Sequence, residues 1–223
     1  MNATRTPLRA APAAGRLHLL VFRPPAEEVA QVCPLMQALD EMEAARAASY
    51  VSARDRTQYV AAHATLRGLL AAYTGLEPGR IVLGRGAEPY GKPQLIDPPV
   101  PLHFNLSHSH GLIAIGVAAA PVGVDVQRVP SPEAVEMVLP RLHPQERAEL
   151  RELPAAERTV AFARLWTRKE AYLKGLGTGL TRSPAADYLG DRNAQGRPHG
   201  WTVRNVPVQP GYAAAAALRN HPT

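Results

Sequence analysis

One stretch decides how the rest of the chain is interpreted: Trp166-Thr167-Arg168-Lys169-Glu170-Ala171-Tyr172-Leu173-Lys174-Gly175-Leu176-Gly177-Thr178-Gly179-Leu180. Its first part contains good helix formers and no proline, which predicts a helix that ends at the glycines. At 3.6 residues per turn, Glu170 shares a face with Trp166 and Leu173. A carboxylate on a core-facing stripe is costly to desolvate alone, so we expect Glu170 to have a partner. An ordinary amphipathic helix with a Glu170–Lys174 pair one turn apart would give the same pattern.

The composition is that of a globular chain of 223 residues, either one large domain or two small ones tightly joined. Cys33 is the only cysteine, which excludes an internal disulfide and a cysteine-rich zinc site. The apolar run at residues 17–22 has the length of a strand and is too short for a signal peptide or a membrane span. We therefore expect a soluble, cytoplasmic protein in which residues 1–14 form a loose tail.

The formal net charge of +6 favours an acidic partner. Nucleic acid, a phosphorylated ligand and an acidic protein would all satisfy this charge. The sequence has no block of Lys and Arg, no RNA-binding aromatic motif and no zinc-finger spacing, so nucleic acid is the weakest of the three.

Before residue 90 the chain alternates between strand and helix patterns. Residues 16–22 predict a first strand, and Asp55 to Tyr73 predicts a strong helix that Thr74-Gly75 ends. His63 lies on the apolar face of that helix, where we expect a core histidine with satisfied hydrogen bonds. Residues 80–83 predict a short strand.

Two polar segments follow. In Gly91-Lys92-Pro93 the lysine is mounted between a glycine and a proline, which suits a phosphate contact. The run from Leu102 to Gly111 predicts a strand and a turn made of Ser-His-Ser-His, and residues 112–117 predict the returning strand. A hairpin turn so rich in hydrogen-bonding side chains indicates binding. His103, His108 and His110 do not have the spacing of a helical metal site.

Val122-Gly123-Val124-Asp125-Val126-Gln127-Arg128 alternates as a strand should. Period two places Asp125 and Gln127 on one face and the valines on the other. Two oxygen-bearing side chains on a strand face suit a hard cation if one further carboxylate completes the site. A polar, exposed edge strand would show the same alternation.

The chain also shows a faint internal repeat. Tyr59, His63 and Arg67 precede a Gly-Leu turn with the same spacing as Phe162, Trp166 and Glu170, at an offset of 103 residues. Helices at residues 132–165 and a terminal hairpin at 201–218 complete the second part. We therefore expect an α+β fold of two similar halves, residues 15–121 and 122–223, related by a pseudo-twofold axis with the active cleft between them.

Four segments in order make a specific pattern, and it resembles the 4'-phosphopantetheinyl transferases of the surfactin-synthetase-activating class. They are Gly91-Lys92-Pro93, Phe104-Asn105-Leu106-Ser107-His108-Ser109, Gly123-Val124-Asp125-Val126 and the Trp166–Leu180 stretch. The resemblance extends from about Arg46 to Tyr212. It implies a pseudo-duplicated α+β fold and an enzyme that transfers the phosphopantetheine arm of coenzyme A to a carrier-protein serine, releasing adenosine 3',5'-bisphosphate.

The resemblance also implies roles for individual residues. The catalytic residues would be Asp125, Lys174 and Glu170, the last as the base for the serine. The family often has a glutamate where this chain has Gln127, so magnesium would be held by Asp125, Gln127 and Glu170. Contacts to coenzyme A would come from six residues: Arg46, Lys92, Pro93, Ser107, His108 and Lys174.

The implied partners are coenzyme A and an acidic acyl or peptidyl carrier protein, with no nucleic acid and no membrane, and the enzyme would act as a monomer. A module that binds coenzyme A or a carrier protein without catalysis is the alternative. Such a module would keep Lys92 and His108 but would need no pair of metal-binding carboxylates.

Overall fold

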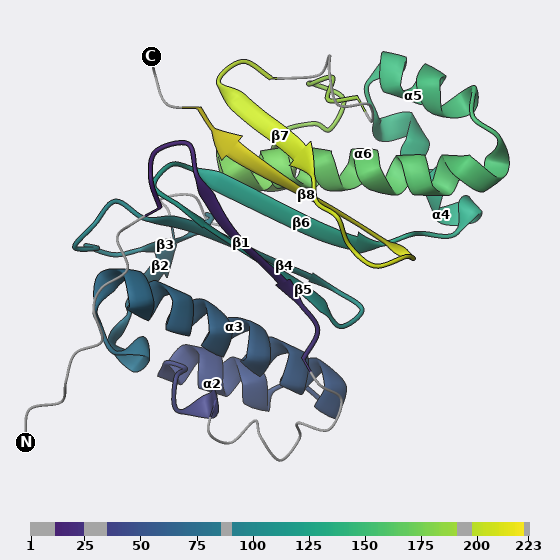
Figure 1. Ribbon diagram of the computed structural model, residues 1–223. Coiled ribbons are helices and arrows are strands. Elements are labelled where there is room, and N and C mark those ends of the chain that lie inside the picture. Colours follow the sequence, from purple (N-terminus) through teal and green to yellow (C-terminus); the bar gives the residue numbers. More distant parts are fainter. Residues whose placement is uncertain (1–11, 25–34, 86–90, 191–197, 221–223) are drawn as a thin grey trace, which may run out of the picture.

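The computed structural model describes residues 12–24, 35–85, 91–190 and 198–220. It has a mixed α and β architecture (Figure 1). The elements up to residue 118 are β1 (Leu17–Phe22), α2 (Glu41–Ala48), α3 (Ala53–Thr74), β2 (Leu83–Arg85), β3 (Pro93–Leu95), β4 (His103–Ser109) and β5 (Leu112–Ala118). The later elements are β6 (Val122–Arg128), α4 (Pro132–Val138), α5 (Pro144–Arg151), α6 (Ala155–Leu176), β7 (Trp201–Asn205) and β8 (Tyr212–Arg219).

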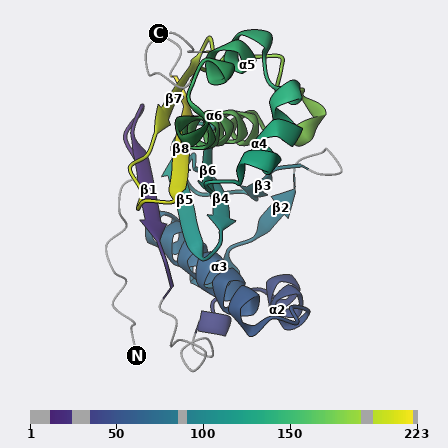
Figure 2. The same cartoon turned by 90° about the vertical axis from the view of Figure 1, so that its right-hand side faces the viewer.

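Two antiparallel three-stranded sheets form the centre of the molecule. The N-terminal sheet has the order β1-β5-β4 and the C-terminal sheet the order β6-β8-β7, while β2 and β3 pair separately. Alternation along β5 explains the layers: Ile113, Ile115 and Val117 pack with α3, whereas Leu112 and Ala114 pack with β6 and β8. The order of layers is therefore α3, N-terminal sheet, C-terminal sheet and α6 (Figures 1 and 2).

The edge strands β4 and β6 are joined through side chains of β4. The side-chain oxygens of three alternate β4 residues accept hydrogen bonds from three alternate backbone N–H groups of β6, in the same direction along both strands. The pairs are Asn105 with Val124 at 2.8 Å, Ser107 with Val126 at 3.4 Å and Ser109 with Arg128 at 3.1 Å. We call these three hydrogen bonds the seam. The seam holds the two sheets in a fixed register at the edge that carries the polar residues.

The long helices begin and end at residues suited to those positions. The Ser52 side chain caps α3, and α6 follows Pro154. Both helices end at a glycine in the left-handed region, Gly75 with φ 72° and Gly177 with φ 79°, a conformation that costs glycine little. At Gly123 of β6 a Cβ would overlap backbone atoms of α6, so the missing side chain allows α6 to lie directly on the strand.

Most predicted elements are confirmed, including the first strand, the helix over 55–73, the strand over 122–128 and the terminal hairpin. The predicted turn Ser-His-Ser-His is wrong, because Ser107 to Ser109 continue β4 and the turn is His110-Gly111, with φ 48° and 86°. The hydroxyl groups of Ser107 and Ser109 accept hydrogen bonds from the backbone of β6, and these residues therefore continue the strand. The predicted strand at 80–83 is also wrong, since a 3-10 helix occupies Pro78–Arg80 and β2 starts at Leu83.

One expectation from the sequence falls on a segment outside the described ranges, since residues 1–11 of the expected tail are not among the described residues. Among the described helices, none is both long and apolar enough to cross a membrane.

Candidate active site

Asp125 is the centre of a polar cluster built from β4, β6 and α6. Its side chain is buried in β6, with a relative exposure of 5%. Its Oδ1 atom accepts a hydrogen bond from the Ser107 hydroxyl at 2.8 Å and forms an ion pair with Lys174 Nζ at 2.5 Å. Lys174 Nζ also donates to Ser107 Oγ at 3.0 Å. The structure therefore brings together three predicted site residues that are far apart in the sequence.

Glu170 lies one helical turn before Lys174 and supplies a second carboxylate to this cluster. It is half-buried, and its pKa is raised first by burial and then by the charge of Asp125, while Lys174 acts in the opposite direction. Burial also raises the pKa of Asp125, against the lowering effects of Lys174 and Ser107. Within the described residues Lys174 forms its ion pair with Asp125 and none with Glu170. The ordinary Glu170–Lys174 pair is therefore not the arrangement that this helix adopts.

The donor set of this cluster fits a magnesium ion. Asp125 Oδ2 is buried and has no hydrogen-bond partner in the described part of the chain, which leaves a carboxylate oxygen free for a cation. Glu170 is the second carboxylate, and the partly exposed Gln127 follows Asp125 on the same strand face. Magnesium is commonly held by one or two carboxylates together with phosphate oxygens and water. No group of three or more His, Cys, Asp or Glu side chains suited to a metal occurs among the described residues.

His108 lies on the opposite face of β4 from Ser107 and connects the cluster with α3. Its pKa is lowered mainly by burial, and the charges of His63 on α3 and Lys174 on α6 lower it further. His63 is a half-buried histidine whose Nδ1 lies 2.8 Å from Glu43 Oε1, as expected for a satisfied side chain. His108 is therefore close to both the α3 helix and the Asp125 cluster.

An aromatic path leads from this histidine pair to Arg46 on α2. His63 stacks on Tyr59 with ring centroids 4.0 Å apart, and Tyr59 contacts Tyr50 at 5.4 Å. The exposed Arg46 guanidinium lies over the Tyr50 ring, 5.4 Å from its centroid. Arg46 is thus at the exposed end of a row of rings that begins at His63, and the described residues show no contact between Arg46 and the Asp125 cluster.

Lys92 lies apart from the Asp125 cluster, in a pocket at the start of β6. Its Nζ donates a hydrogen bond to the Val122 carbonyl, and burial lowers its pKa to about 8. Pro93, the first residue of β3, is exposed beside it. The pocket has a volume of about 270 Å³ and its charged or titratable lining groups are all basic. They are Lys92, His103 and Arg219.

A buried ion pair behind Glu170 was not foreseen from the sequence. Lys169 is 2% exposed, and its Nζ lies 2.7 Å from Glu146 Oε2 of α5. The same Nζ donates to the carbonyls of Pro184 and Asp187, each at 2.7 Å. Glu146 also accepts a hydrogen bond from the Leu189 amide. This network fixes the segment after α6 against α5 and α6.

Several known proteins are similar to this chain. The 4'-phosphopantetheinyl transferase superfamily matches residues 121–213, the part that carries Asp125, Glu170 and Lys174. The chain is 35% identical to the 4'-phosphopantetheinyl transferase HetI of a Nostoc species, over 68% of this chain and 65% of that protein. It is 33% identical to a 4'-phosphopantetheinyl transferase of Bacillus subtilis (54% of each chain) and 30% identical to the transferase gsp of Aneurinibacillus migulanus (59% of this chain, 53% of the relative).

The matched part of the chain, residues 121–213, therefore belongs to the 4'-phosphopantetheinyl transferase superfamily. The match spans somewhat more than half of the length of these curated relatives, from 53% to 65%.

Proposed function

We propose that this protein transfers the 4'-phosphopantetheine arm of coenzyme A to a serine of an acyl or peptidyl carrier protein. The observation that carries the proposal is the Asp125 cluster, in which a free buried carboxylate oxygen lies beside a second carboxylate and a lysine. This set suits a pyrophosphate held by a cation and a basic side chain. The relatives that match this region are named for the same transfer.

In the proposed mechanism Asp125 and Glu170, with Gln127 beside them, hold a magnesium ion. When bound, the ion supplies positive charge to the pyrophosphate of coenzyme A. The serine Oγ attacks the β-phosphorus, a new O–P bond forms, and the bond to the leaving adenosine 3',5'-bisphosphate breaks. Glu170, whose pKa is raised by burial and by Asp125, accepts the serine proton.

The remaining predicted residues would bind coenzyme A around this centre. Lys174 and Ser107, which already contact Asp125, would also contact its phosphates. His108 would approach them from the opposite face of β4, and Arg46 would bind the 3'-phosphate at the end of the aromatic path. Lys92, from the pocket at the start of β6, would contact a phosphate of coenzyme A, and the adjacent Pro93 would contact coenzyme A beside it. Each contact to a charged phosphate contributes about 1.5–3 kcal/mol.

We further propose that the chain consists of two similar halves, residues 15–121 and 122–223, related by a pseudo-twofold axis. Three observations support this proposal. Both sheets have the strand order first, last, middle, in sequence numbering. Each sheet is covered by a helix of 22 residues that ends at a left-handed glycine. The Asp125 cluster takes residues from both halves, as a cleft between them requires.

The proposed enzyme is a cytoplasmic monomer whose partners are coenzyme A and a carrier protein, with no nucleic acid or membrane involved. The net charge of +6 supports an acidic carrier. The test is the intact mass of an apo carrier protein after incubation with the purified protein, coenzyme A and magnesium. We expect the carrier to gain the mass of one phosphopantetheine. Tight binding of coenzyme A without any such gain would favour the non-catalytic binding module.

A further inference from the structure

Three arginines gather around the turn between β4 and β5. Arg23 follows β1, Arg54 is in the first turn of α3, and Arg128 ends β6. Arg23 is held in place, since one of its nitrogens donates to the His110 carbonyl at 3.1 Å and the other to the Tyr212 hydroxyl at 3.0 Å. We call Arg23, Arg54 and Arg128 the arginine cluster.

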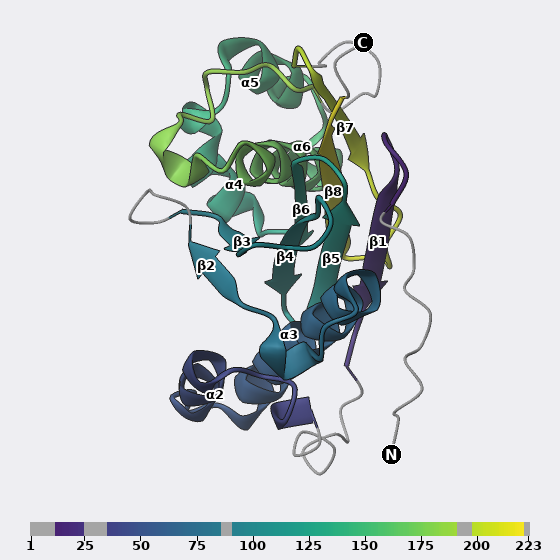
Figure 3. The ribbon, with the colours of Figure 1, turned by 90° about the vertical axis from the view of Figure 1, so that its left-hand side faces the viewer.

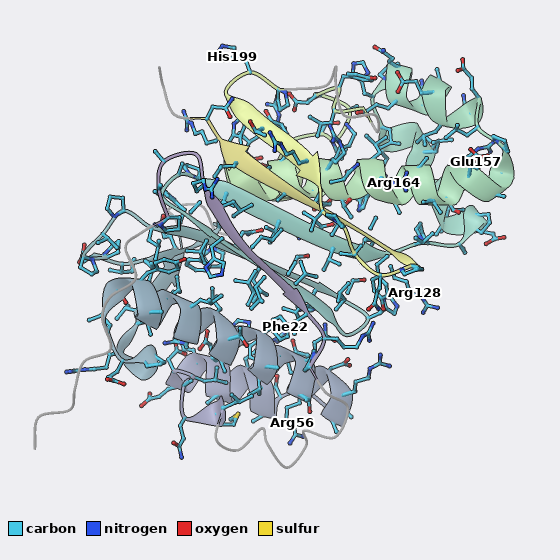
Figure 4. All side chains as sticks on the ribbon, viewed as in Figure 1. Phe22, Arg56, Arg128, Glu157, Arg164 and His199 are labelled. Atoms are coloured by element: carbon cyan, nitrogen blue, oxygen red, sulfur yellow. The ribbon has the colours of Figure 1, made fainter. Side chains whose placement is uncertain are left out.

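The turn glycine shows how closely two of these guanidinium groups approach. A Cβ built on Gly111 would lie 2.7 Å from Arg23 Nη1 and 3.6 Å from Arg54 Nη2. Tyr212 links them to the third arginine, because the Arg23 guanidinium lies 5.6 Å from its ring centre and Arg128 pairs with Tyr212 across β6 and β8. Figure 4 shows Arg128 near the end of the β4–β5 hairpin.

The cluster is exposed and its charge is not neutralised by the described residues. All three arginines are exposed, and none of them forms an ion pair with a carboxylate in the described ranges, whereas Arg67, Arg158 and Arg182 each do. Asp55 is next to Arg54 in α3, but the described residues show no ion pair between them. Guanidinium groups that converge without acidic partners repel one another, and an arriving anionic surface relieves that repulsion.

The position of the cluster indicates which substrate it meets. Arg128 is three residues after Asp125 on β6, a distance of about 10 Å at the usual rise of a strand. Of the proposed coenzyme A contacts, Lys92 lies at the opposite end of β6, near Val122, whereas His108 lies two residues before the turn. All three arginines are exposed at the surface, where a macromolecular substrate can reach them.

We propose that the arginine cluster is the docking surface for the acidic helix of the carrier protein beside its reactive serine. This inference rests on the proposed function and adds the location of the second substrate. Exposed complementary charges act mainly on the rate of encounter, so the effect should weaken as salt screens the charges.

The test uses charge reversal in the full chain. Arg23→Glu, Arg54→Glu and Arg128→Glu are prepared singly and together, with Arg151→Glu on α5 as the control, since Arg151 is an exposed arginine on a helix far from the turn. At low salt we expect the KM for an acidic apo carrier to rise about tenfold or more in the triple variant, with each single change contributing part of this rise. The KM for coenzyme A and the kcat at saturating carrier should stay within about twofold of wild type, and Arg151→Glu should behave like wild type.

The outcome can be separated from that of the proposed function by a binding titration of the same apo carrier, which needs no turnover. If wild type transfers the arm and the triple variant binds and uses the carrier as wild type does, the docking proposal is wrong and the function stands. If the KM for coenzyme A rises instead, the cluster binds the nucleotide and the proposal is equally overturned. Should Arg23→Glu disturb the turn, the Arg54→Glu, Arg128→Glu pair carries the test, because neither side chain holds a hydrogen bond recorded in the described residues.

Discussion

Loss of the charge on either Asp125 or Glu170 should abolish most of the transfer activity. The protein should stay folded in both cases. Asp125→Asn and Glu170→Gln keep the shape of each side chain but remove a charge that the cation and the serine proton require. We expect each to lower kcat by at least about a hundredfold, the loss typical when a charge-stabilising group is removed from an active site. Transfer rates at saturating magnesium and the melting temperature are the measurements.

Glu157→Gln provides the matched control, because Glu157 is an exposed glutamate in the first turn of the same helix (Figure 4). It should retain wild-type kcat. A near-wild-type kcat in either carboxylate variant would remove that residue from the mechanism.

Lys92 should make both coenzyme A binding and stability depend on pH. Burial lowers its pKa from the usual 10.5 of a lysine to about 8, so the ammonium is charged at pH 7 and mostly neutral at pH 9. The pKa of His103, which lines the same pocket, is already lowered by burial and by Lys92. The KM for coenzyme A should therefore rise between pH 7 and pH 9 in the wild type, by more than in Lys92→Met.

The same shift predicts the sign of a stability effect. Between pH 8 and pH 10.5 the unfolded chain carries a proton on Lys92 that the folded chain does not, so the free energy of unfolding should rise with pH through this group. Below pH 8 the folded chain carries the buried ammonium of Lys92, and the free energy of unfolding is lowered by the full cost of burying that charge. Urea titrations should show Lys92→Met gaining stability relative to wild type at pH 7 and losing that gain by pH 10. A constant difference between the two proteins would show that Lys92 keeps its charge.

The sequence could indicate which residues form the candidate site, but not how they pair. A carboxylate at Glu170 was expected to have a partner, and it does lie beside charged groups. The lysine one turn later was its nearest candidate, yet Lys174 forms its ion pair with Asp125 of β6. A contact between residues 49 positions apart depends on how α6 lies on the sheet, which helical periodicity alone does not determine.

At the scale of elements, the strong periodic patterns were sufficient to predict the helix and the strand that carry them. The helix over 55–73 and the alternating strand over 122–128 were predicted within two residues at each end. The serines of β4 misled the prediction because serine favours turns, in which its hydroxyl can hydrogen-bond to the neighbouring backbone. Here the partners are backbone N–H groups of β6, which no local pattern reveals.

Contact between α6 and β6 should depend on the absence of a side chain at Gly123. A Cβ there would overlap the Ala171 carbonyl oxygen and the Gly175 amide nitrogen, and backbone cannot move aside as a flexible side chain does. We expect Gly123→Ala to lower the free energy of unfolding by about 1–3 kcal/mol and to lower kcat, since Asp125 and Lys174 move with these two elements.

Gly68→Ala is the matched control for this substitution. Gly68 is exposed in the middle of α3, and nothing lies within 4 Å of a Cβ built there. Alanine in a helix interior is favoured over glycine, so this variant should gain about 0.5–1 kcal/mol. Urea denaturation measures both changes. Equal effects at the two positions would mean that α6 does not pack on β6 as closely as described.

At the scale of the whole molecule, the arrangement of layers follows from which faces are apolar. Apolar side chains point to both faces of β5, so both faces must be buried. The α3 helix covers one face and the C-terminal sheet covers the other (Figures 1 and 3). The internal repeat at an offset of 103 residues predicted two related parts. It could not predict the seam, because Asn105 and Ser109 have no counterpart in that repeat and their partners are backbone groups of another sheet.

The seam should make the two sheets unfold as one cooperative unit. Asn105→Ala and Ser109→Ala each leave a backbone N–H of β6, that of Val124 or Arg128, without its acceptor. Both side chains are buried at 8% exposure, so water cannot easily replace them. Each change should lower the free energy of unfolding by about 1–3 kcal/mol, the usual cost of an unsatisfied buried group. Ser49→Ala is the control, because its exposed hydroxyl bonds only to the Arg46 carbonyl and its loss should change little.

Chemical denaturation followed by circular dichroism and by tryptophan fluorescence would measure this coupling. Trp166 on α6 and Trp201 on β7 both report on the C-terminal half, while the helical signal includes α3 on the N-terminal sheet. If the seam couples the sheets, the double variant should lose stability equally by both signals, with coincident transitions in the wild type. A double variant whose fluorescence transition stays at the wild-type midpoint while the helical signal shifts would show that the C-terminal sheet is stable without the seam, and the two sheets would then be independent folding units.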